Sequence, residues 1–287
     1  MTVTIPAYAK INLFLDIESL RDNGYHNIIS IMQSVSLHDD ITVSYSSDDV
    51  KSISVFCDNF DIPCDKSNLV YKAADIFPAI GKINVNICKR IPVSAGLAGG
   101  SADAAATLIA LNEATGNRLS EDELCALGAR LGADVPFCIK KGACLVEGIG
   151  EKLTPVASMP RFPIVIAKKG EGMSTPAAYK ALDVRFDNFT DYSPNTGRCD
   201  ILFDSDSRLN AKSFCAGLFN IFETVVEPQR PAVTELKEIM LSSNAAGAMM
   251  SGSGTSVFGI FNNETDAKDA LTALKACGAE AHLCYPL

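Results

Sequence analysis

The chain has 287 residues, of which 47% are hydrophobic and 21% are charged, and its formal net charge at pH 7 is −9. This length suits one large domain or two closely associated ones, and the composition is sufficient for a sizeable core. The negative charge argues against a general affinity for nucleic acid or for a membrane surface, because a polyanion would be repelled. A small anionic ligand stays possible, because a local field can bind it.

Ten cysteines are spread along the chain without a CxxC pair, and most lie in apolar stretches such as residues 135–139. This distribution favours buried thiols in a reducing compartment over a disulfide framework or a zinc site. Residues 1–10 lack the features of a signal peptide, and no apolar stretch reaches the length of a membrane span. We therefore expect a cytoplasmic protein that binds neither membrane nor nucleic acid.

The first forty residues alternate in hydropathy as strands do, and Asp22-Asn23-Gly24 predicts a connection between two of them. Further strands are expected at 41–46, 53–56, 83–89, 143–147 and 162–167. Helices are expected at 68–77, 101–114 and 121–131. Ser120 and Glu123 predict a capping box at the start of the last helix.

The polar segment 187–206, with Pro194 and Gly197, predicts a surface loop or the edge of a domain. The remaining chain predicts a helix, two strands, a helix and a strand, at 231–241, 248–250, 257–261, 265–276 and 281–285. This order indicates an antiparallel sheet covered by helices. The expected fold class is α+β in two lobes, with domains at 1–160 and 161–287.

The strongest local signal is a strand that runs into a glycine-rich turn and then into a helix, Pro92-Val93-Ser94-Ala95-Gly96-Leu97-Ala98-Gly99-Gly100-Ser101-Ala102. Glycines permit a close backbone approach, and the free N–H groups and dipole of a first helical turn favour a phosphate. The spacing fits neither a Walker A loop nor Gly-x-Gly-x-x-Gly, which disfavours a Rossmann fold. A glycine-rich loop that serves packing alone is the alternative.

The pattern Pro-x-x-x-Gly-Leu-x-Gly-Gly-Ser-x-Asp-Ala-Ala from Pro92 resembles the phosphate-binding motif of the GHMP kinases, the group of galactokinase, homoserine kinase and mevalonate kinase. Residues 9–15 and 250–259 resemble two further motifs of this family. The resemblance implies a two-lobed GHMP kinase fold, with the phosphate-binding turn in the N-terminal lobe. It also implies transfer of the γ-phosphate of ATP, with Mg²⁺, to a hydroxyl of a small molecule. The chain departs from the family mildly at Ala98, where Gly is common, and at Ala102, where many members carry Ser.

Residues 21–26, 131–137 and 147–151 narrow the resemblance to members whose substrate is a cytidine diphosphate derivative of methylerythritol. Those members phosphorylate its 2-hydroxyl in the non-mevalonate synthesis of isoprenoid precursors. The resemblance places Tyr25, His26 and Tyr179 around the cytosine ring, where aromatic faces suit a pyrimidine. It also assigns Asn12 and Thr175 to substrate binding.

Asp134 and Lys10 are the catalytic residues that the resemblance implies. Asp134 lies in an apolar segment, where a carboxylate is costly unless it is paired or used, and it would accept or orient the proton of the attacking hydroxyl. Lys10 would keep that carboxylate ionised and favour the alkoxide. A helix-terminal aspartate and a solvent-exposed strand lysine are the alternatives for these two residues.

Other assignments are less specific. Rough similarity to the family places Lys89 and Asn68 near the adenine. The sequence identifies no metal ligand, although Ser101 is a candidate and Glu147 and Glu151 are weaker ones. The segment 252–255 is either a hairpin turn or a loop that shapes the active site.

Two other functions stay open. One is a GHMP kinase for another alcohol, such as mevalonate, homoserine or a sugar. The other is a non-catalytic nucleotide-binding protein of the same fold. The sequence does not indicate the oligomeric state.

Overall fold

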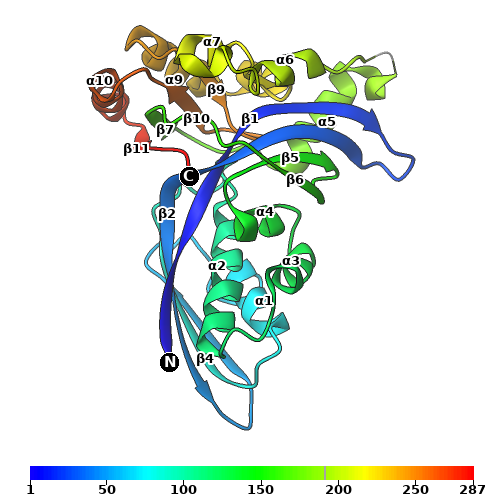
Figure 1. Cartoon of the computed structure of the whole chain (residues 1–287), viewed down its shortest axis with the longest axis vertical. Helices are drawn as coiled ribbons and strands as arrows, with labels where there is room; N and C mark the ends of the chain where they lie inside the picture. The colour runs from blue at the N-terminus through cyan, green and yellow to red at the C-terminus, as the bar shows by residue number, and fades with distance from the viewer. Residues whose placement is uncertain (191) are drawn as a thin grey trace. The chain divides into compact units, whose positions relative to one another are not determined.

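The computed structural model describes residues 1–190 and 192–287 (Figure 1), and these residues form two compact units. The first unit comprises residues 1–9, 38–91 and 98–141, and the second comprises 10–37, 92–97 and 142–287. The long strands β1 (Thr2–Leu20) and β2 (His26–Ser47) contribute residues to both units. Each unit combines helices and strands, which confirms the α+β class, whereas the division into domains 1–160 and 161–287 stays a prediction.

The strands of the first unit present one apolar face. The second half of β2 pairs antiparallel with β4 (Gly81–Cys88), and β3 (Ser52–Cys57) pairs in parallel with β4. Burial alternates along β4: Ile83, Val85 and Ile87 are buried, and the residues between them are more exposed. This period of two follows from the pleat of a strand and gives the helices of the unit a surface to cover.

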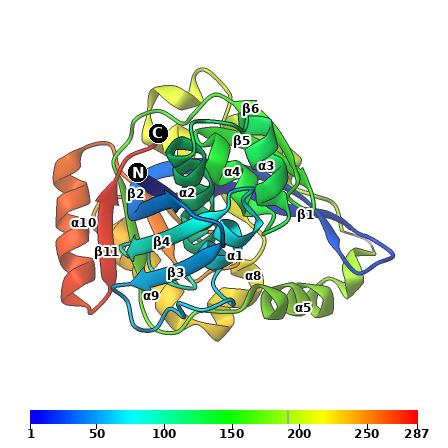
Figure 2. The same cartoon turned by 90° about the horizontal axis from the view of Figure 1, so that it is seen from below.

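Four helices complete the first unit: α1 (Leu69–Ile76), α2 (Gly99–Ala114), α3 (Glu121–Ala129) and α4 (Asp134–Lys140). Helix α2 packs against α1, α3 and α4 (Figures 1 and 2). The expected capping box is present at the start of α3, since Ser120 accepts a hydrogen bond from the Glu123 N–H and the Glu123 carboxylate accepts one from the Ser120 N–H.

The second unit contains strands from two sheets. The first half of β2 pairs with β5 (Ala143–Gly148), β5 pairs with β6 (Lys152–Val156), and β1 pairs in parallel with β8 (Phe219–Asn220). A separate antiparallel sheet has the order β11 (Glu280–Cys284), β7 (Ile164–Lys168), β10 (Val257–Ile260) and β9 (Gly247–Met250). Helices α9 (Pro231–Ser242) and α10 (Glu264–Ala276) pack on this sheet, which confirms the predicted arrangement (Figure 1).

The prediction of a surface loop at 187–206 is partly wrong. The segment contains α6 (Thr196–Ile201) and a 3₁₀ turn at Asp187–Phe189, while residue 191 lies outside the described residues. The fully buried Asp16 of β1 accepts hydrogen bonds from Asn195 N, at 2.8 Å, and from the Tyr192 hydroxyl, at 2.6 Å. Tyr192 and Asn195 are therefore hydrogen-bonded to a buried residue that is far away in the sequence.

Shorter elements complete the second unit. They are α5 (Thr175–Arg185), α7 (Ala211–Cys215), α8 (Glu223–Val226) and 3₁₀ turns at Ser207–Leu209 and Glu227–Gln229.

All ten cysteines are free thiols. The expectation that they are buried is confirmed only in part, because Cys64 is exposed and the buried ones are Cys57, Cys138, Cys144, Cys199 and Cys284. Burial raises the pKa of Cys215 and of Cys284 to about 12, so neither is a thiolate at neutral pH.

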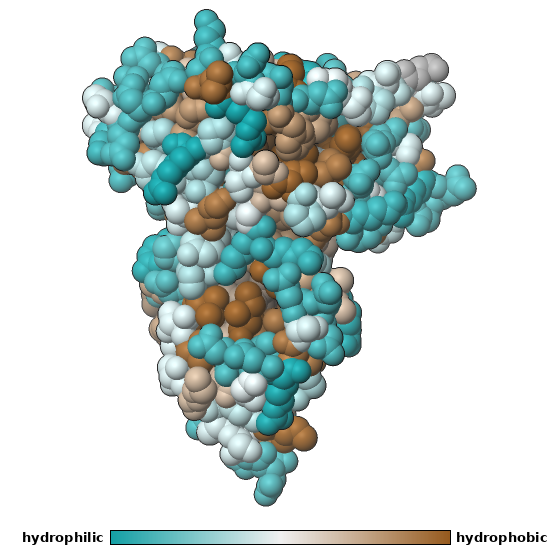
Figure 3. All heavy atoms as spheres, in the orientation of Figure 1, coloured by the Kyte–Doolittle hydropathy of each residue, from teal (hydrophilic) through white to brown (hydrophobic). Residues whose placement is uncertain are grey.

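The face in Figure 3 is mainly hydrophilic, with apolar patches between the polar side chains. Within residues 1–190 and 192–287, no helix is both long and apolar enough to span a bilayer.

Candidate active site

The glycine-rich segment leads into the first turn of α2. The helix begins at Gly99, and its first turn carries no acidic side chain. The N–H groups of a first turn cannot be bonded within the helix, so together with the helix dipole they attract an anion. This geometry favours the predicted phosphate site.

Ala98 caps α2 in the left-handed conformation, with φ 57° and ψ 28°. For a residue other than glycine this conformation costs about 1–2 kcal/mol. The replacement of the family's common glycine by alanine is therefore less mild than expected.

The turn residues 92–97 pack in the second unit against the segment 251–256, which connects β9 with β10. A Cβ atom at Gly96 would lie 2.1 Å from the Ser251 carbonyl oxygen, and Gly96 has φ +74°, so only glycine fits there. The Ser251 hydroxyl donates to the Gly96 carbonyl at 3.1 Å, and Ser256 N donates to the Ala95 carbonyl at 3.2 Å. The segment 251–256 is thus a hairpin connection that also holds the turn.

Asn220 fixes this hairpin connection from β8. Its side-chain amide donates to the carbonyls of Met250 and Gly252, both at 2.8 Å, and its Oδ1 accepts from Phe222 N at 3.0 Å. The residue is 2% exposed, so a buried amide uses every polar group of its side chain. Sequence reasoning missed Asn220, although an asparagine inside the apolar run 218–222 was an available signal.

Lys10 and Asn12 lie on β1 in the second unit and are buried. The Lys10 ammonium donates to Asn12 Oδ1 at 2.5 Å, and Asn12 Nδ2 donates to the Ser30 hydroxyl at 2.8 Å. Lys10 N donates to the Leu97 carbonyl at 3.2 Å, and the ammonium lies 3.3 Å from where a Cβ would stand at Gly252. Lys10 is therefore not a solvent-exposed strand lysine, because it lies beside both glycine-rich segments.

Asp134 belongs to the first unit and is the first residue of α4. It is half-buried, and the residues that follow it, 135–139, are buried. This position fits a helix-terminal aspartate as well as a catalytic one, so the role of Asp134 stays a prediction.

An aromatic cluster in the second unit contains two of the predicted substrate residues. The ring centroids of His26 and Tyr179 are 4.7 Å apart, and the angle between the ring planes is 30°. His26 Nε2 lies 2.6 Å from Asp183 Oδ1. Tyr25, by contrast, is 59% exposed. Asp183 was missed by sequence reasoning, because its partner His26 is 157 residues away.

Thr175, the first residue of α5, is exposed. Its hydroxyl oxygen lies 2.9 Å from that of Ser253, in the hairpin connection. The structure thus places Thr175 beside the hairpin connection 251–256.

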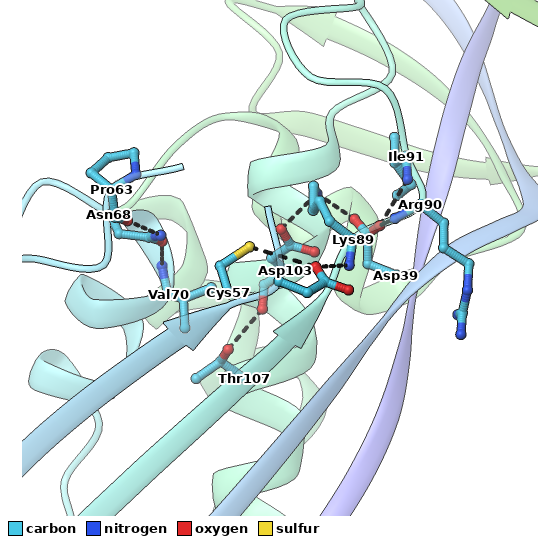
Figure 4. A network of polar contacts seen from close by, with 11 residues as sticks. Asp39, Cys57, Pro63, Asn68, Val70, Lys89, Arg90, Ile91, Asp103 and Thr107 are labelled. Carbon is cyan, nitrogen blue, oxygen red and sulfur yellow. Dashed lines mark hydrogen bonds and ion pairs between the residues drawn. The ribbon is translucent and has the colours of Figure 1, made fainter. Parts of the chain in front are cut away.

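Asn68 and Lys89 have structural partners in the first unit (Figure 4). Asn68 caps α1, because its Oδ1 accepts from Val70 N at 2.8 Å. The Lys89 ammonium contacts the carboxylates of Asp39 and Asp103. Burial alone would lower the pKa of Lys89, but attraction by the two carboxylates outweighs it and raises this pKa, so Lys89 stays charged. Their contacts with adenine stay predictions.

The candidate metal ligands do not form a cluster. Across residues 1–190 and 192–287, three or more His, Cys, Asp or Glu side chains nowhere come together as a metal site. Ser101 is half-buried in the first turn of α2, whereas the Glu151 carboxylate accepts from Ile149 N.

Comparisons with known proteins identify the family of the chain. Residues 68–142 match the model of the GHMP kinases N terminal domain, and residues 205–280 match that of the GHMP kinases C terminal. A protein of Caldicellulosiruptor saccharolyticus named 4-diphosphocytidyl-2-C-methyl-D-erythritol kinase is 45% identical over 94% of this chain and 92% of its own. The chain belongs to this family of GHMP kinases.

Two further matches support the family. The protein of the same name from Clostridium novyi is 42% identical over 91% of this chain and 92% of its own. A crystal structure of 4-(cytidine 5'-diphospho)-2C-methyl-D-erythritol kinase matches with a TM-score of 0.83 and 29% identity, covering 99% of both chains. The protein is therefore a small-molecule kinase with the GHMP fold, and ATP is its phosphate donor.

Proposed function

We propose that this kinase phosphorylates the 2-hydroxyl of 4-diphosphocytidyl-2-C-methyl-D-erythritol, a step in the non-mevalonate synthesis of isoprenoid precursors, in the cytoplasm. The observation that carries the choice of substrate is the aromatic cluster of His26 and Tyr179, with His26 held by Asp183. An imidazole edge beside an aromatic face suits the polar edge and flat face of cytosine. Tyr25 is exposed and able to cover a bound base.

The first turn of α2 would bind the ATP phosphates through the N–H groups of Gly99, Gly100 and Ser101. Mg²⁺, with Ser101 as its candidate side-chain ligand, would screen the negative charge of the ATP phosphates.

Phosphoryl transfer then requires an aligned nucleophile. The 2-hydroxyl oxygen forms a bond to the γ-phosphorus, the bond to the β,γ-bridging oxygen breaks, and ADP leaves. Asp134 receives or orients the proton of the hydroxyl, and the Lys10 ammonium stabilises negative charge on the attacking oxygen. Asn12 fixes Lys10 through the 2.5 Å hydrogen bond.

The test is ADP release by the purified protein with Mg-ATP and 4-diphosphocytidyl-2-C-methyl-D-erythritol, with mevalonate and homoserine assayed in parallel. Turnover confined to the cytidine compound, with competition by cytidine nucleotides, is the expected result. Turnover with another alcohol would overturn the cytosine assignment but keep the kinase. ATP binding without turnover on any alcohol would favour the non-catalytic alternative.

A further inference from the structure

Three charged side chains of the first unit meet near the start of α2 (Figure 4). Asp39 comes from β2, Lys89 directly follows β4, and Asp103 lies on α2. Their side chains are 0%, 6% and 5% exposed, so all three are shielded from water. The sequence motifs do not explain Asp39, and the proposed mechanism uses neither carboxylate.

Asp39 holds the chain that enters the phosphate-binding turn. Its Oδ1 accepts hydrogen bonds from the backbone N–H of Arg90 and from that of Ile91, the latter at 2.8 Å. Its Oδ2 accepts from the Lys89 ammonium. Ile91 immediately precedes Pro92, so one buried carboxylate fixes the last residues before the turn.

Lys89 connects this point to α2. Its ammonium lies 2.8 Å from Asp103 Oδ2, and it would be 3.1 Å from a Cβ atom at Gly99. The same Cβ would lie 3.2 Å from Ile91 Cγ2. The ammonium and Ile91 thus pack directly against the residue that begins α2, and a side chain there would displace them.

Burying such a network of charges costs free energy. Two carboxylates surround one ammonium, and Asp103 Oδ1 is buried without a hydrogen-bond partner. Well-packed apolar residues commonly replace buried ion pairs with no loss of stability, or with a gain. A gain in stability therefore explains the presence of these three residues poorly. Their contacts do fix the positions of two backbone segments, residues 89–91 and the start of α2.

We propose that Asp39, Lys89 and Asp103 are positioning residues, which hold the strand exit 89–91 and the first turn of α2 in the arrangement that binds the ATP phosphates. This inference rests on the proposed function, because it takes the first turn of α2 as the phosphate site. Asp39 fixes the backbone that follows β4, and Asp103 provides the contact on α2. Lys89 connects the two carboxylates.

The test uses D39N and D103N, each of which keeps the size of the side chain and replaces a carboxyl group with a neutral amide. D40N is the matched control, because Asp40 is the neighbouring residue on β2 and makes an exposed ion pair with Arg90, at 2.6 Å. We expect D39N and D103N to raise the KM and the Kd for Mg-ATP about 10- to 100-fold, since small misplacements of a binding group have effects of this size. The KM for the alcohol and all constants of D40N should stay within about twofold.

Circular dichroism and melting curves separate positioning from folding. A folded D39N or D103N with unchanged KM and Kd for Mg-ATP would overturn the inference. A lower activity that is explained entirely by a smaller fraction of folded protein would overturn it as well. If D39N does not fold, the Kd of D103N decides. A wild-type protein that binds no nucleotide would overturn the proposed function itself, whereas normal wild-type turnover with wild-type-like variants would overturn this inference alone.

Discussion

The glycine-rich turn and its flanking residues are held by two kinds of chemistry. In the second unit, residues 92–97 are fixed by neutral hydrogen bonds from Ser251 and Ser256, and Asn220 supports the hairpin connection. In the first unit, residues 89–91 and the start of α2 are fixed by buried charges. Neutral hydrogen bonds do not titrate near pH 7 and depend on shape, whereas a buried ionic network depends on protonation. The two regions should therefore fail under different perturbations.

The largest effect is expected from a change of shape on the neutral side. G96A should lower the free energy of unfolding by about 2–4 kcal/mol, because the new Cβ meets the Ser251 carbonyl in a backbone conformation that disfavours alanine. Urea unfolding measures this loss. G278A is the control, because Gly278 has φ +84° with nothing within 4 Å of its Cβ position, and it should lose only about 1 kcal/mol. Equal losses in both variants would show that the contact with Ser251 does not constrain the turn.

A smaller effect, dependent on pH, is expected on the charged side. Burial raises the pKa of Asp103 to about 7, and repulsion from Asp39 adds to this, while Lys89 opposes it. Since this folded-state pKa exceeds the unfolded one, Asp103 contributes stability at low pH that is lost as the pH rises through 7. Lys89 and Asp39 are the charged groups that act on it.

D103N should remove this dependence. The stability difference between wild type and D103N is expected to change by about 1–2 kcal/mol between pH 5.5 and pH 8, in favour of wild type at the lower pH. Urea unfolding at both values measures it. N220A, on the neutral side, should lose the same amount at both pH values. A difference for D103N that does not vary with pH would contradict the ionic account of this region.

The smallest effect is expected where the two regions join. A98G should raise the free energy of unfolding by about 0.5–1 kcal/mol, because glycine adopts the left-handed conformation of residue 98 without strain. A126G, at an exposed position inside α3, should instead lower it by about 1 kcal/mol. Thermal unfolding compares the two. A loss of stability in A98G would show that Ala98 is not strained.

Short-range patterns predicted much of this molecule. The capping box depends on Ser120 and Glu123, which are close in the sequence, and α2 starts directly after the glycine-rich turn. Both features could be predicted because the residues that determine them are neighbours in the chain. The antiparallel sheet was predicted from the order of helices and strands expected in residues 231–285. Lys10 was assigned by resemblance, and its burial agrees with a role inside a site.

Long-range polar contacts could not be predicted in the same way. Asp39 and Lys89 are 50 residues apart, and Asp16 and Asn195 are 179 apart, so no local pattern links them. The left-handed conformation of Ala98 was missed because alanine normally favours a helix. Asn220 has the hydropathy of a loop residue, yet it is buried because its amide pairs with two carbonyls of the hairpin connection.

The most direct test of the kinase mechanism is D134N, assayed for ADP release with Mg-ATP and 4-diphosphocytidyl-2-C-methyl-D-erythritol and, separately, for the Kd of Mg-ATP. We expect turnover to fall by about 100-fold or more while the Kd stays within about twofold of wild type, because a base acts on the hydroxyl and not on nucleotide binding. Turnover near that of wild type in the folded variant would contradict the assignment of Asp134 and return it to the role of a helix-terminal aspartate.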